Sequence, residues 1–465
     1  MAPPAPGGVE WLGLRGHLID APIFGQLRSW REGAVLIDPA TGRIAEIGDF
    51  GLLKRRHRPH AVRWVGEPHH LIIPGLVDTH THLPQYPAVA RGEGELLPWL
   101  RQSIFPLERD FSKPRAQLQA PLFYFDLARH GTTAAMVYSA IYEDSTDYAF
   151  EAAAASGLRI SLGKVMMDVA SYGPLQPKKI LSVSLLESET LCRKWHGANE
   201  GLLQYVFSPR FAVSCSERLM RGAGELAKQY GTAIQTHLAE NVGEIEKVRY
   251  QFTWSTDYTD VYEKCGLVTP RSVFGHCIHL LPREIAALAA AGAKIAHCPT
   301  SNLYLGSGIM PFDRLRAAGL CIGLGSDVAA GPELNLWTVM RSAIDSQRAR
   351  SFYERDVKPL KVADVFHLAT QAGAEVLGAG KSIGSLDAGK EADLTVIDVE
   401  SLLPYGSTGF PRVSELSPQD LVALCVYRGG PTATVATYVR GRKVYGAGQA
   451  PPPHAQRPDA DACDI

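Results

Sequence analysis

The chain has 465 residues, of which 46% are hydrophobic and 20% charged, and this composition is typical of a globular protein that can bury a sizeable core. The formal net charge of -1, without any basic block, argues against binding to nucleic acid or to an anionic membrane surface, and no apolar run approaches the roughly 20 residues of a membrane-spanning helix. The first residues also lack the segments of a signal peptide, so we expect a cytoplasmic protein whose eight scattered cysteines are reduced thiols.

Short β-like runs open the chain. They are broken by Gly, Pro and Asp, the residues that favour turns. Four strands are expected before residue 73: Glu10–Ala21, Gly33–Asp38, Ile44–Gly48 and Ala61–Val65.

The middle of the chain, residues 73–384, alternates apolar strand-like runs with longer helical stretches. This alternation predicts βα units around a parallel sheet. Eight strands are expected, the number that closes a (β/α)8 TIM-type barrel. They are Ile72–Asp78, Thr132–Ser139, Arg159–Met166, Gln204–Ser208, Ala233–His237, Ser272–His276, Lys294–His297 and Cys321–Ser326.

β character returns in residues 385–447. The expected strands there are Ala392–Asp398, Leu421–Tyr427, Thr432–Arg440 and Arg442–Tyr445. We expect residues 1–72 and 385–447 to form a small β-sandwich domain beside the barrel, which makes the protein an α/β protein. Residues 448–465 are rich in Pro, Ala and Asp, and we expect a flexible tail.

A His-x-His pair, His80 and His82, ends the first barrel strand. Alternate residues of a strand point to the same face, so both imidazoles can reach one divalent metal. Three further strands end in potential ligands, at His237, His276 and Asp327. Because the carboxyl ends of barrel strands meet at one face, these five side chains predict a common metal site with imidazole and carboxylate donors, which suit Zn2+ or Fe2+.

Other histidines and cysteines are weaker candidates. His297 ends the seventh strand and is the best further candidate, for a role without metal contact. His279 would leave the strand axis. Cys277 and Cys298 each follow a histidine, but a neighbouring strand residue points to the opposite face.

This set of ligands, in this order, resembles the amidohydrolase superfamily. The chain is most similar to its guanine deaminase branch, over nearly the whole length up to about residue 447. The motifs that carry the resemblance are Pro-Gly-Leu-Val-Asp-Thr-His-Thr-His-Leu-Pro-Gln-Tyr (74–86), Gly-Lys-Val-Met-Met-Asp (163–168), Ser-Pro-Arg-Phe-Ala-Val-Ser-Cys-Ser-Glu (208–217), Thr-His-Leu-Ala-Glu-Asn (236–241), Ala-His-Cys-Pro-Thr-Ser-Asn (296–302) and Gly-Leu-Gly-Ser-Asp-Val-Ala-Ala-Gly (323–331).

The resemblance implies a zinc enzyme, in a homodimer, that hydrolyses guanine to xanthine and ammonia. A metal here would lower the pKa of bound water from about 15.7 towards 7. Glu240, three residues beyond His237, is expected to transfer protons to the ring and to departing ammonia. Asp327 is expected to accept a proton from the water as well as to contact the metal.

One Zn2+ per chain is expected. Relatives that bridge two metals use a lysine on the fourth strand, and no lysine ends that strand here. Lys164, on the third strand, is the alternative bridging residue.

The resemblance also implies contacts with the substrate. Arg210 can only donate hydrogen bonds, so it can hold the O6 carbonyl of guanine and reject adenine. Gln85 is expected at the purine edge and Phe211 against the ring, while Trp99 and Leu100 follow the first strand and could close over it. The expected substrate-binding set is His82, Gln85, Arg210, Phe211, His237, Glu240, His276 and Asp327.

Two alternatives stay open at this point. The nearest is another aminohydrolase, acting on cytosine, a triazine or an adenosine-like base. The more remote is a non-catalytic scaffold, although proteins of that kind tend to lose metal ligands and this chain has all five.

Overall fold

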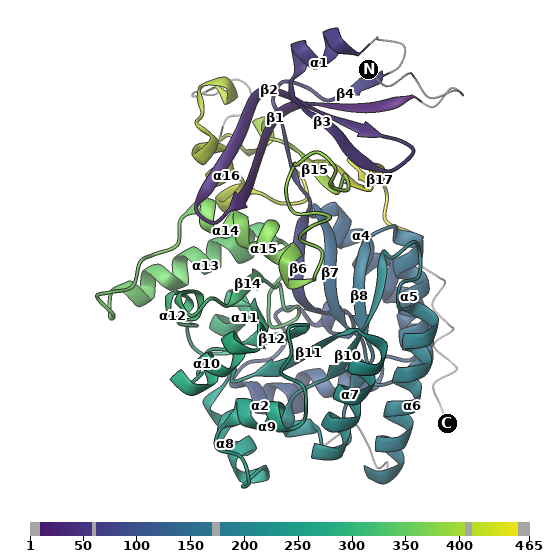
Figure 1. Ribbon diagram of the computed structural model, residues 1–465, viewed down its shortest axis with the longest axis vertical. Coiled ribbons are helices and arrows are strands. Elements are labelled where there is room, and N and C mark those ends of the chain that lie inside the picture. Colours follow the sequence, from purple (N-terminus) through teal and green to yellow (C-terminus); the bar gives the residue numbers. More distant parts are fainter. Residues whose placement is uncertain (1–9, 58–61, 170–176, 405–411, 454–465) are drawn as a thin grey trace.

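Two β-sheets organise the chain (Figure 1). The computed structural model describes residues 10–57, 62–169, 177–404 and 412–453. The sheet of the chain ends, coloured purple and yellow, lies above a parallel sheet surrounded by helices in blue, teal and green.

The parallel sheet is the expected barrel. Its strands are β6 (Leu76–His82), β7 (Thr132–Tyr138), β8 (Arg159–Gly163), β10 (Leu203–Pro209), β11 (Ala233–Leu238), β12 (Ser272–His276), β13 (Lys294–His297) and β14 (Cys321–Leu324), with the short β9 (Val165–Met166) paired to β10. Consecutive strands pair in parallel from β6 to β14. The circle is nearly closed, because Asp327 donates its backbone N–H to His80 O at 2.9 Å and the Thr79 hydroxyl donates to Leu324 O at 2.9 Å.

Helices follow the barrel strands and cover the outside of the barrel (Figure 1). Most connect one strand to the next, as a right-handed βαβ arrangement requires. The helices are α1 (Phe50–Arg56), α2 (Leu96–Trp99), α3 (Phe105–Arg109), α4 (Lys113–Arg129), α5 (Glu143–Ser156), α6 (Pro177–Trp195), α7 (Glu217–Tyr230), α8 (Val242–Gln251), α9 (Tyr258–Lys264), α10 (Pro282–Ala290), α11 (Pro299–Tyr304), α12 (Phe312–Ala317), α13 (Leu336–Ser351), α14 (Val362–Leu368), α15 (Gln371–Val376) and α16 (Pro418–Arg428).

Both chain ends contribute to the second sheet, as expected. Its strands are β1 (Trp11–Ile23), β2 (Gln26–Asp38), β3 (Arg43–Asp49), β4 (Val62–Val65), β5 (His70–Pro74), β15 (Leu394–Asp398), β16 (Thr434–Val439) and β17 (Arg442–Gly446). The expected sandwich is realised as one sheet in the order β17-β16-β15-β5-β1-β2-β3, with β4 also on β1. Side chains from both ends share one apolar cluster, which contains Leu14, Val35, Ile72 and Leu394.

The first expected barrel strand is divided between the two sheets. Ile72 and Ile73 belong to β5, which pairs with β1 and β15, whereas the barrel strand begins at Leu76. A continuous apolar run does not show where one sheet ends and the next begins. The expected domain boundary between residues 72 and 73 therefore falls within β5, and the division of the chain into 1–72, 73–384 and 385–447 stays a prediction.

The prediction of a strand at Leu421–Tyr427 is wrong, because these residues form most of the helix α16. Ser417 caps this helix through its side chain, and Pro418 occupies the first turn, where it needs no hydrogen-bond partner. The buried residues Leu421, Val422, Cys425 and Val426 repeat at helical spacing, which an uninterrupted apolar run conceals.

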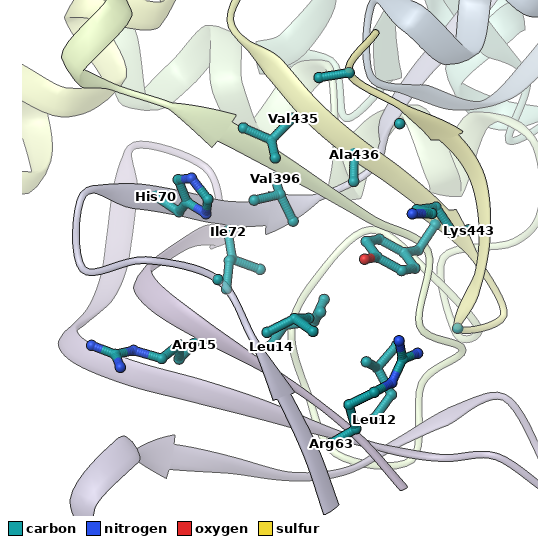
Figure 2. Close-up of a pocket in the computed structure, with 16 residues that line it drawn as sticks. Leu12, Leu14, Arg15, Arg63, His70, Ile72, Val396, Val435, Ala436 and Lys443 are labelled. Atoms are coloured by element: carbon teal, nitrogen blue, oxygen red, sulfur yellow. The ribbon is translucent and has the colours of Figure 1, made fainter. Parts of the chain in front are cut away.

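A cavity of about 430 Å³ lies on the sheet of the chain ends (Figure 2). Leu12, Leu14 and Ile72 line it together with the basic side chains Arg63 and Lys443. Its lining residues come from the chain ends, so it is separate from the carboxyl face of the barrel.

Two remaining expectations concern cysteines and the tail. The seven cysteines within the described part of the chain form no disulfide. Residues 454–465 of the expected tail lie outside the described residues. Among the described helices, none combines the length and the apolar character needed to cross a bilayer.

Candidate metal centre and the pocket around it

The five side chains expected as metal ligands converge at the carboxyl end of the barrel. His80 and His82 end β6, His237 and His276 lie at the ends of β11 and β12, and Asp327 follows β14. The Nε2 atom of His82 lies 3.3 Å from Nε2 of His80 and 3.3 Å from Nε2 of His237. Asp327 Oδ1 lies 3.3 Å from Nε2 of both His80 and His82, and Asp327 Oδ2 lies 3.7 Å from Nε2 of His276.

These distances fit one divalent ion. Two donors that each lie ~2.0–2.1 Å from a tetrahedral ion are about 3.3–3.4 Å apart. Groups of three donors, such as His80, His82 and Asp327, have all their ligand atoms within 4.8 Å of one another. Nε2 of His276 is buried without a hydrogen-bond partner among the described residues, as expected of a donor meant for a cation. The residues present therefore suit a metal bound by nitrogen and oxygen.

Contacts behind two of the histidines fix their rings. Nδ1 of His237 donates to the carbonyl oxygen of Arg210 at 2.7 Å, and Nδ1 of His276 donates to Asn302 Oδ1 at 2.8 Å. Because the proton then sits on Nδ1, Nε2 presents its lone pair to the centre.

The position of His80 depends on close backbone approach. A Cβ atom on Gly275 would lie 2.8 Å from Cε1 of His80, and one on Gly325 would lie 2.7 Å from its Cβ. Only glycine leaves room for the imidazole at these two points. Asp78 adds a further tie across the barrel closure, since it accepts hydrogen bonds from the Ser326 backbone at 3.0 Å and hydroxyl at 2.5 Å.

Burial sets the charge states of the centre. It lowers the pKa of His82 to about 4, and burial together with the neighbouring His80 lowers the pKa of His237 well below its usual value. Burial alone would raise the pKa of Asp327, but hydrogen bonds with His80 and His82 bring it well below the usual range. Neutral imidazoles and an ionised carboxylate are the forms that bind metal.

Glu240 lies beside this cluster. Its Oε2 atom is 3.4 Å from His276 Nε2, and the Ser307 hydroxyl donates to Oε1 at 3.4 Å. Burial, reinforced by the charge of Asp327, raises the pKa of Glu240 well above its usual value. Its backbone is held by Glu244, whose Oε2 accepts from Glu240 N at 2.9 Å. Glu240 is thus a buried acid directed at the same space as the metal donors.

Every expected substrate contact lines one pocket, and four of the five expected metal donors are among them. The space left among these side chains is about 20 Å³, enough for a water molecule, and the segment after β6 contributes Leu96, Trp99 and Leu100 to the wall. The lining residues are His82, Gln85, Leu96, Trp99, Leu100, Arg210, Phe211, His237, Glu240, His276, Leu305, Asp327 and Ala330.

Lys164, His279 and His297 do not join the donor cluster. The Lys164 amine lies 3.2 Å from Glu187 Oε2 and donates to Ile141 O at 3.0 Å. His279 Nε2 donates to Ser307 O at 2.7 Å. His297 is fully buried without a hydrogen-bond partner among the described residues, and burial lowers its pKa to about 3. Cys298 does lie with His276 and Asp327 in one group of possible donors, contrary to the expectation from strand alternation.

Sequence reasoning missed Glu108, Asp78 and Asn302. Glu108 is fully buried and contacts both Gln85 and Arg210. The sequence does carry a signal for Asp78, because it lies two residues before His80 and therefore on the same strand face. Glu108 and Asn302 carry no comparable spacing signal.

The backbone at two of the expected metal ligands is unusual. His276 has φ 69° and Asp327 has φ 48°, in the left-handed region that non-glycine residues rarely adopt. Such conformations concentrate at functional sites, where the surrounding structure holds them.

Residues 71–444 of the chain match the model of the Amidohydrolase family. This chain belongs to the amidohydrolase family. Members of the family are metal-dependent hydrolases, in agreement with the histidine and aspartate group at the barrel mouth.

Relatives of this amidohydrolase include guanine deaminases. It is 34% identical to the guanine deaminase of Escherichia coli (strain K12) over 431 residues, which cover 92% of this chain and 94% of that protein. A solved structure of the E. coli guanine deaminase aligns with a TM-score of 0.84 at 31% identity, over 94% of this amidohydrolase and 100% of that chain. The guanine deaminase of C. acetobutylicum, solved with guanine in its active site, aligns with a TM-score of 0.85 at 28% identity over the same shares.

A triazine hydrolase from Arthrobacter aurescens also aligns, with a TM-score of 0.79 over 94% of this amidohydrolase and 96% of that chain. Its sequence is 20% identical, so this likeness concerns the fold alone.

Proposed function

We propose that this amidohydrolase is a zinc-dependent guanine deaminase, which converts guanine and water to xanthine and ammonia. The observation that carries the proposal is the pocket in which four of the five expected metal donors, the buried acid Glu240 and the side chain of Arg210 meet. The similarity to guanine deaminases over most of the chain supports the same substrate.

His80, His82, His237, His276 and Asp327 would hold one Zn2+. When bound, the ion supplies Lewis acidity and lowers the pKa of a water molecule towards 7. Their nitrogen and carboxylate donors favour zinc over Mg2+ or Ca2+, which prefer oxygen. Lys164 contacts Glu187 and Ile141 instead, which supports a single metal.

Asp327 and Glu240 move the protons of the reaction. A C–O bond forms at C2 of guanine, and the C2–N bond to the exocyclic amine breaks. The two protons of water end on ring N3 and on the leaving nitrogen. Asp327 accepts the first as water attacks. Glu240, held protonated by burial, gives its proton to N3, takes up the hydroxyl proton of the adduct and delivers it to the amine. The proton on Asp327 then restores Glu240.

Polar groups of the pocket select the base. Arg210 is 2% exposed and can only donate, so it holds the O6 carbonyl of guanine. Adenine carries an amine at that position and would leave a buried donor unpaired. Gln85 holds the purine edge and Phe211 packs on the ring, while His82, His237 and His276 border the reacting carbon. Trp99 and Leu100 cover the ring.

The oligomer and the location belong to the same proposal. Family resemblance supports a homodimer, and the similarity to the guanine deaminase of Escherichia coli supports a cytoplasmic enzyme of purine catabolism. Light scattering of the purified chain tests the dimer.

Metal analysis combined with an ultraviolet assay tests the function. We expect about one zinc per chain and conversion of guanine to xanthine, with loss of both after chelation and recovery on addition of Zn2+. Cytosine, a triazine and adenosine serve as comparison substrates under the same conditions. Faster ammonia release from one of these would favour that aminohydrolase, and a metal-free protein that deaminates none of them would favour the scaffold.

A further inference from the structure

Glu108 contacts two polar side chains that line the pocket, Gln85 and Arg210. It belongs to α3, it is fully buried, and its two carboxylate oxygens have different partners. Oε1 accepts a hydrogen bond from Gln85 Nε2 at 2.9 Å, and Oε2 pairs with Nη1 of Arg210. One carboxylate thus joins the two side chains that we propose to read the purine.

The carboxylate decides which way the Gln85 amide faces. An ionised carboxylate only accepts hydrogen bonds, so it selects the NH2 end of Gln85. The opposite end, Oε1, accepts from the backbone N–H of Ala329 at 3.3 Å, and a backbone N–H can only donate. Both contacts specify the same orientation. The amide keeps one N–H and one carbonyl lone pair for a ligand.

The same carboxylate holds the Arg210 guanidinium. Glu108 lies on one side of this group, and the ring of Phe105 lies 5.3 Å from its central carbon. Arg210 is 2% exposed, so water cannot compensate its charge. A paired, planar guanidinium presents its remaining N–H groups in fixed directions.

We propose that Glu108 is the positioning residue of the base-selecting wall: it aligns Arg210 and Gln85 so that their donors meet a purine with a carbonyl at position 6. This inference rests on the proposed function and adds the residue that sets its specificity. Glu108 acts through Arg210 and Gln85, so its replacement changes the choice between bases more than the chemistry at C2.

A double-mutant cycle between Glu108→Gln and Arg210→Met tests the inference. We expect each single change to lower kcat/KM for guanine by about 100-fold, the scale of a misplaced binding group. If Glu108 acts through Arg210 and Gln85, the loss in the double variant is smaller than the product of the two single losses, because the contribution of Arg210 can be lost only once. The double variant also removes both buried charges, which protects its folding. Losses that multiply would overturn the inference.

2-Aminopurine supplies a second readout, because it carries the reacting amine but lacks the O6 carbonyl. We expect Glu108→Gln to lower the preference for guanine over 2-aminopurine, whereas a merely structural change lowers both rates in proportion. Glu284→Gln is the matched control, since Glu284 is an equally buried carboxylate that accepts from Leu281 N and Thr259 N away from the pocket. Its guanine preference should equal that of the wild type.

The charge-retaining Glu108→Asp replaces Glu108→Gln if the latter does not fold, with the same comparison. This inference alone is overturned if the wild type deaminates guanine and the Glu108 variant keeps the wild-type preference for guanine over 2-aminopurine. If the zinc-loaded wild type does not deaminate guanine, the proposed function itself is refuted, and guanine is not the substrate.

Discussion

Burial acts in opposite directions on the acids and bases of this site. It lowers the pKa of His82 and His237, so both imidazoles are neutral and ready to bind a cation at neutral pH. It raises the pKa of Glu240, which favours the protonated carboxyl. The pocket therefore places the proposed metal ligands and the proposed general acid side by side.

Replacement of Glu240 separates these two roles. We expect Glu240→Gln to lose about 10²–10⁴-fold in guanine turnover, because the amide cannot pass a proton, and to keep its zinc. Ammonia release and metal analysis measure the two effects. Glu246→Gln, an exposed position on α8, makes the same chemical change and should leave both unchanged. Loss of zinc together with activity in Glu240→Gln would place Glu240 among the ligands instead.

The carboxyl ends of the barrel strands bring residues that are distant in the sequence together at the barrel mouth. The strands β6 and β12 end at histidines, and β11 has His237 as its second-last residue. The segment after β6 lines the pocket through Leu96 and Trp99 of α2. The wrong prediction of a strand within α16 also concerns a single secondary-structure element. Its apolar residues resemble a strand, but Ser417 starts a helix by accepting from Asp420 N at 3.2 Å.

The cap of α16 should be measurable. We expect Ser417→Ala to lower the free energy of unfolding by about 1 kcal/mol, because the first backbone N–H groups of the helix lose their acceptor. Urea unfolding followed by circular dichroism gives this difference. Ser351→Ala removes a hydroxyl at the C-terminal end of α13, where it donates to Arg348 O, and should cost less than about 0.5 kcal/mol. Equal losses at both positions would contradict a capping role.

The barrel and the sheet of the chain ends are joined by a buried ion cluster. Arg159 of β8 contacts Glu391 and reaches Asp393 Oδ2 at 3.2 Å, and Arg440 Nε donates to Glu391 Oε2 at 2.8 Å. Thr395 adds a hydrogen bond from its hydroxyl to Gly131 O at 2.8 Å. The sheet thereby clamps the side of the barrel where its strands begin.

Breaking this cluster should destabilise the whole molecule. We expect Arg159→Met to lower the free energy of unfolding by about 3–5 kcal/mol at pH 7, because the buried carboxylates of Glu391 and Asp393 each lose their contact with Arg159. Arg341→Met removes an exposed pair with Asp345, at 3.5 Å, and should cost at most about 1 kcal/mol. Chemical denaturation of both variants provides the comparison, and similar costs would show that the cluster is not a clamp.

The effect of Arg159→Met should depend on pH. Burial alone would raise the pKa of Glu391, but its bond with Arg440 and the charge of Arg159 outweigh burial and lower that pKa from 4.5. A carboxylate with a lowered pKa stabilises the fold fully above its unfolded pKa and loses this contribution as the pH falls through the folded value. The difference between wild type and Arg159→Met should therefore shrink below pH 4.5. Unfolding at pH 7 and at pH 4 measures it, and a constant difference would exclude Glu391 as its source.

Sequence alone determined the class of fold and which five side chains come together as possible metal donors. Strand alternation and the position of polar residues after apolar runs are local properties, so both can be recognised in the sequence alone. They place His80, His82, His237, His276 and Asp327 at strand ends that a barrel must bring together.

Tertiary structure decided what local patterns cannot express. The run 70–78 is shared by two sheets, because strand pairing depends on partners far away in the chain. Likewise, Glu108 meets Arg210 across 102 positions of sequence. The partner of a buried charge is set by packing, and the contact between Glu108 in α3 and Arg210, which follows β10, exists only in the folded chain.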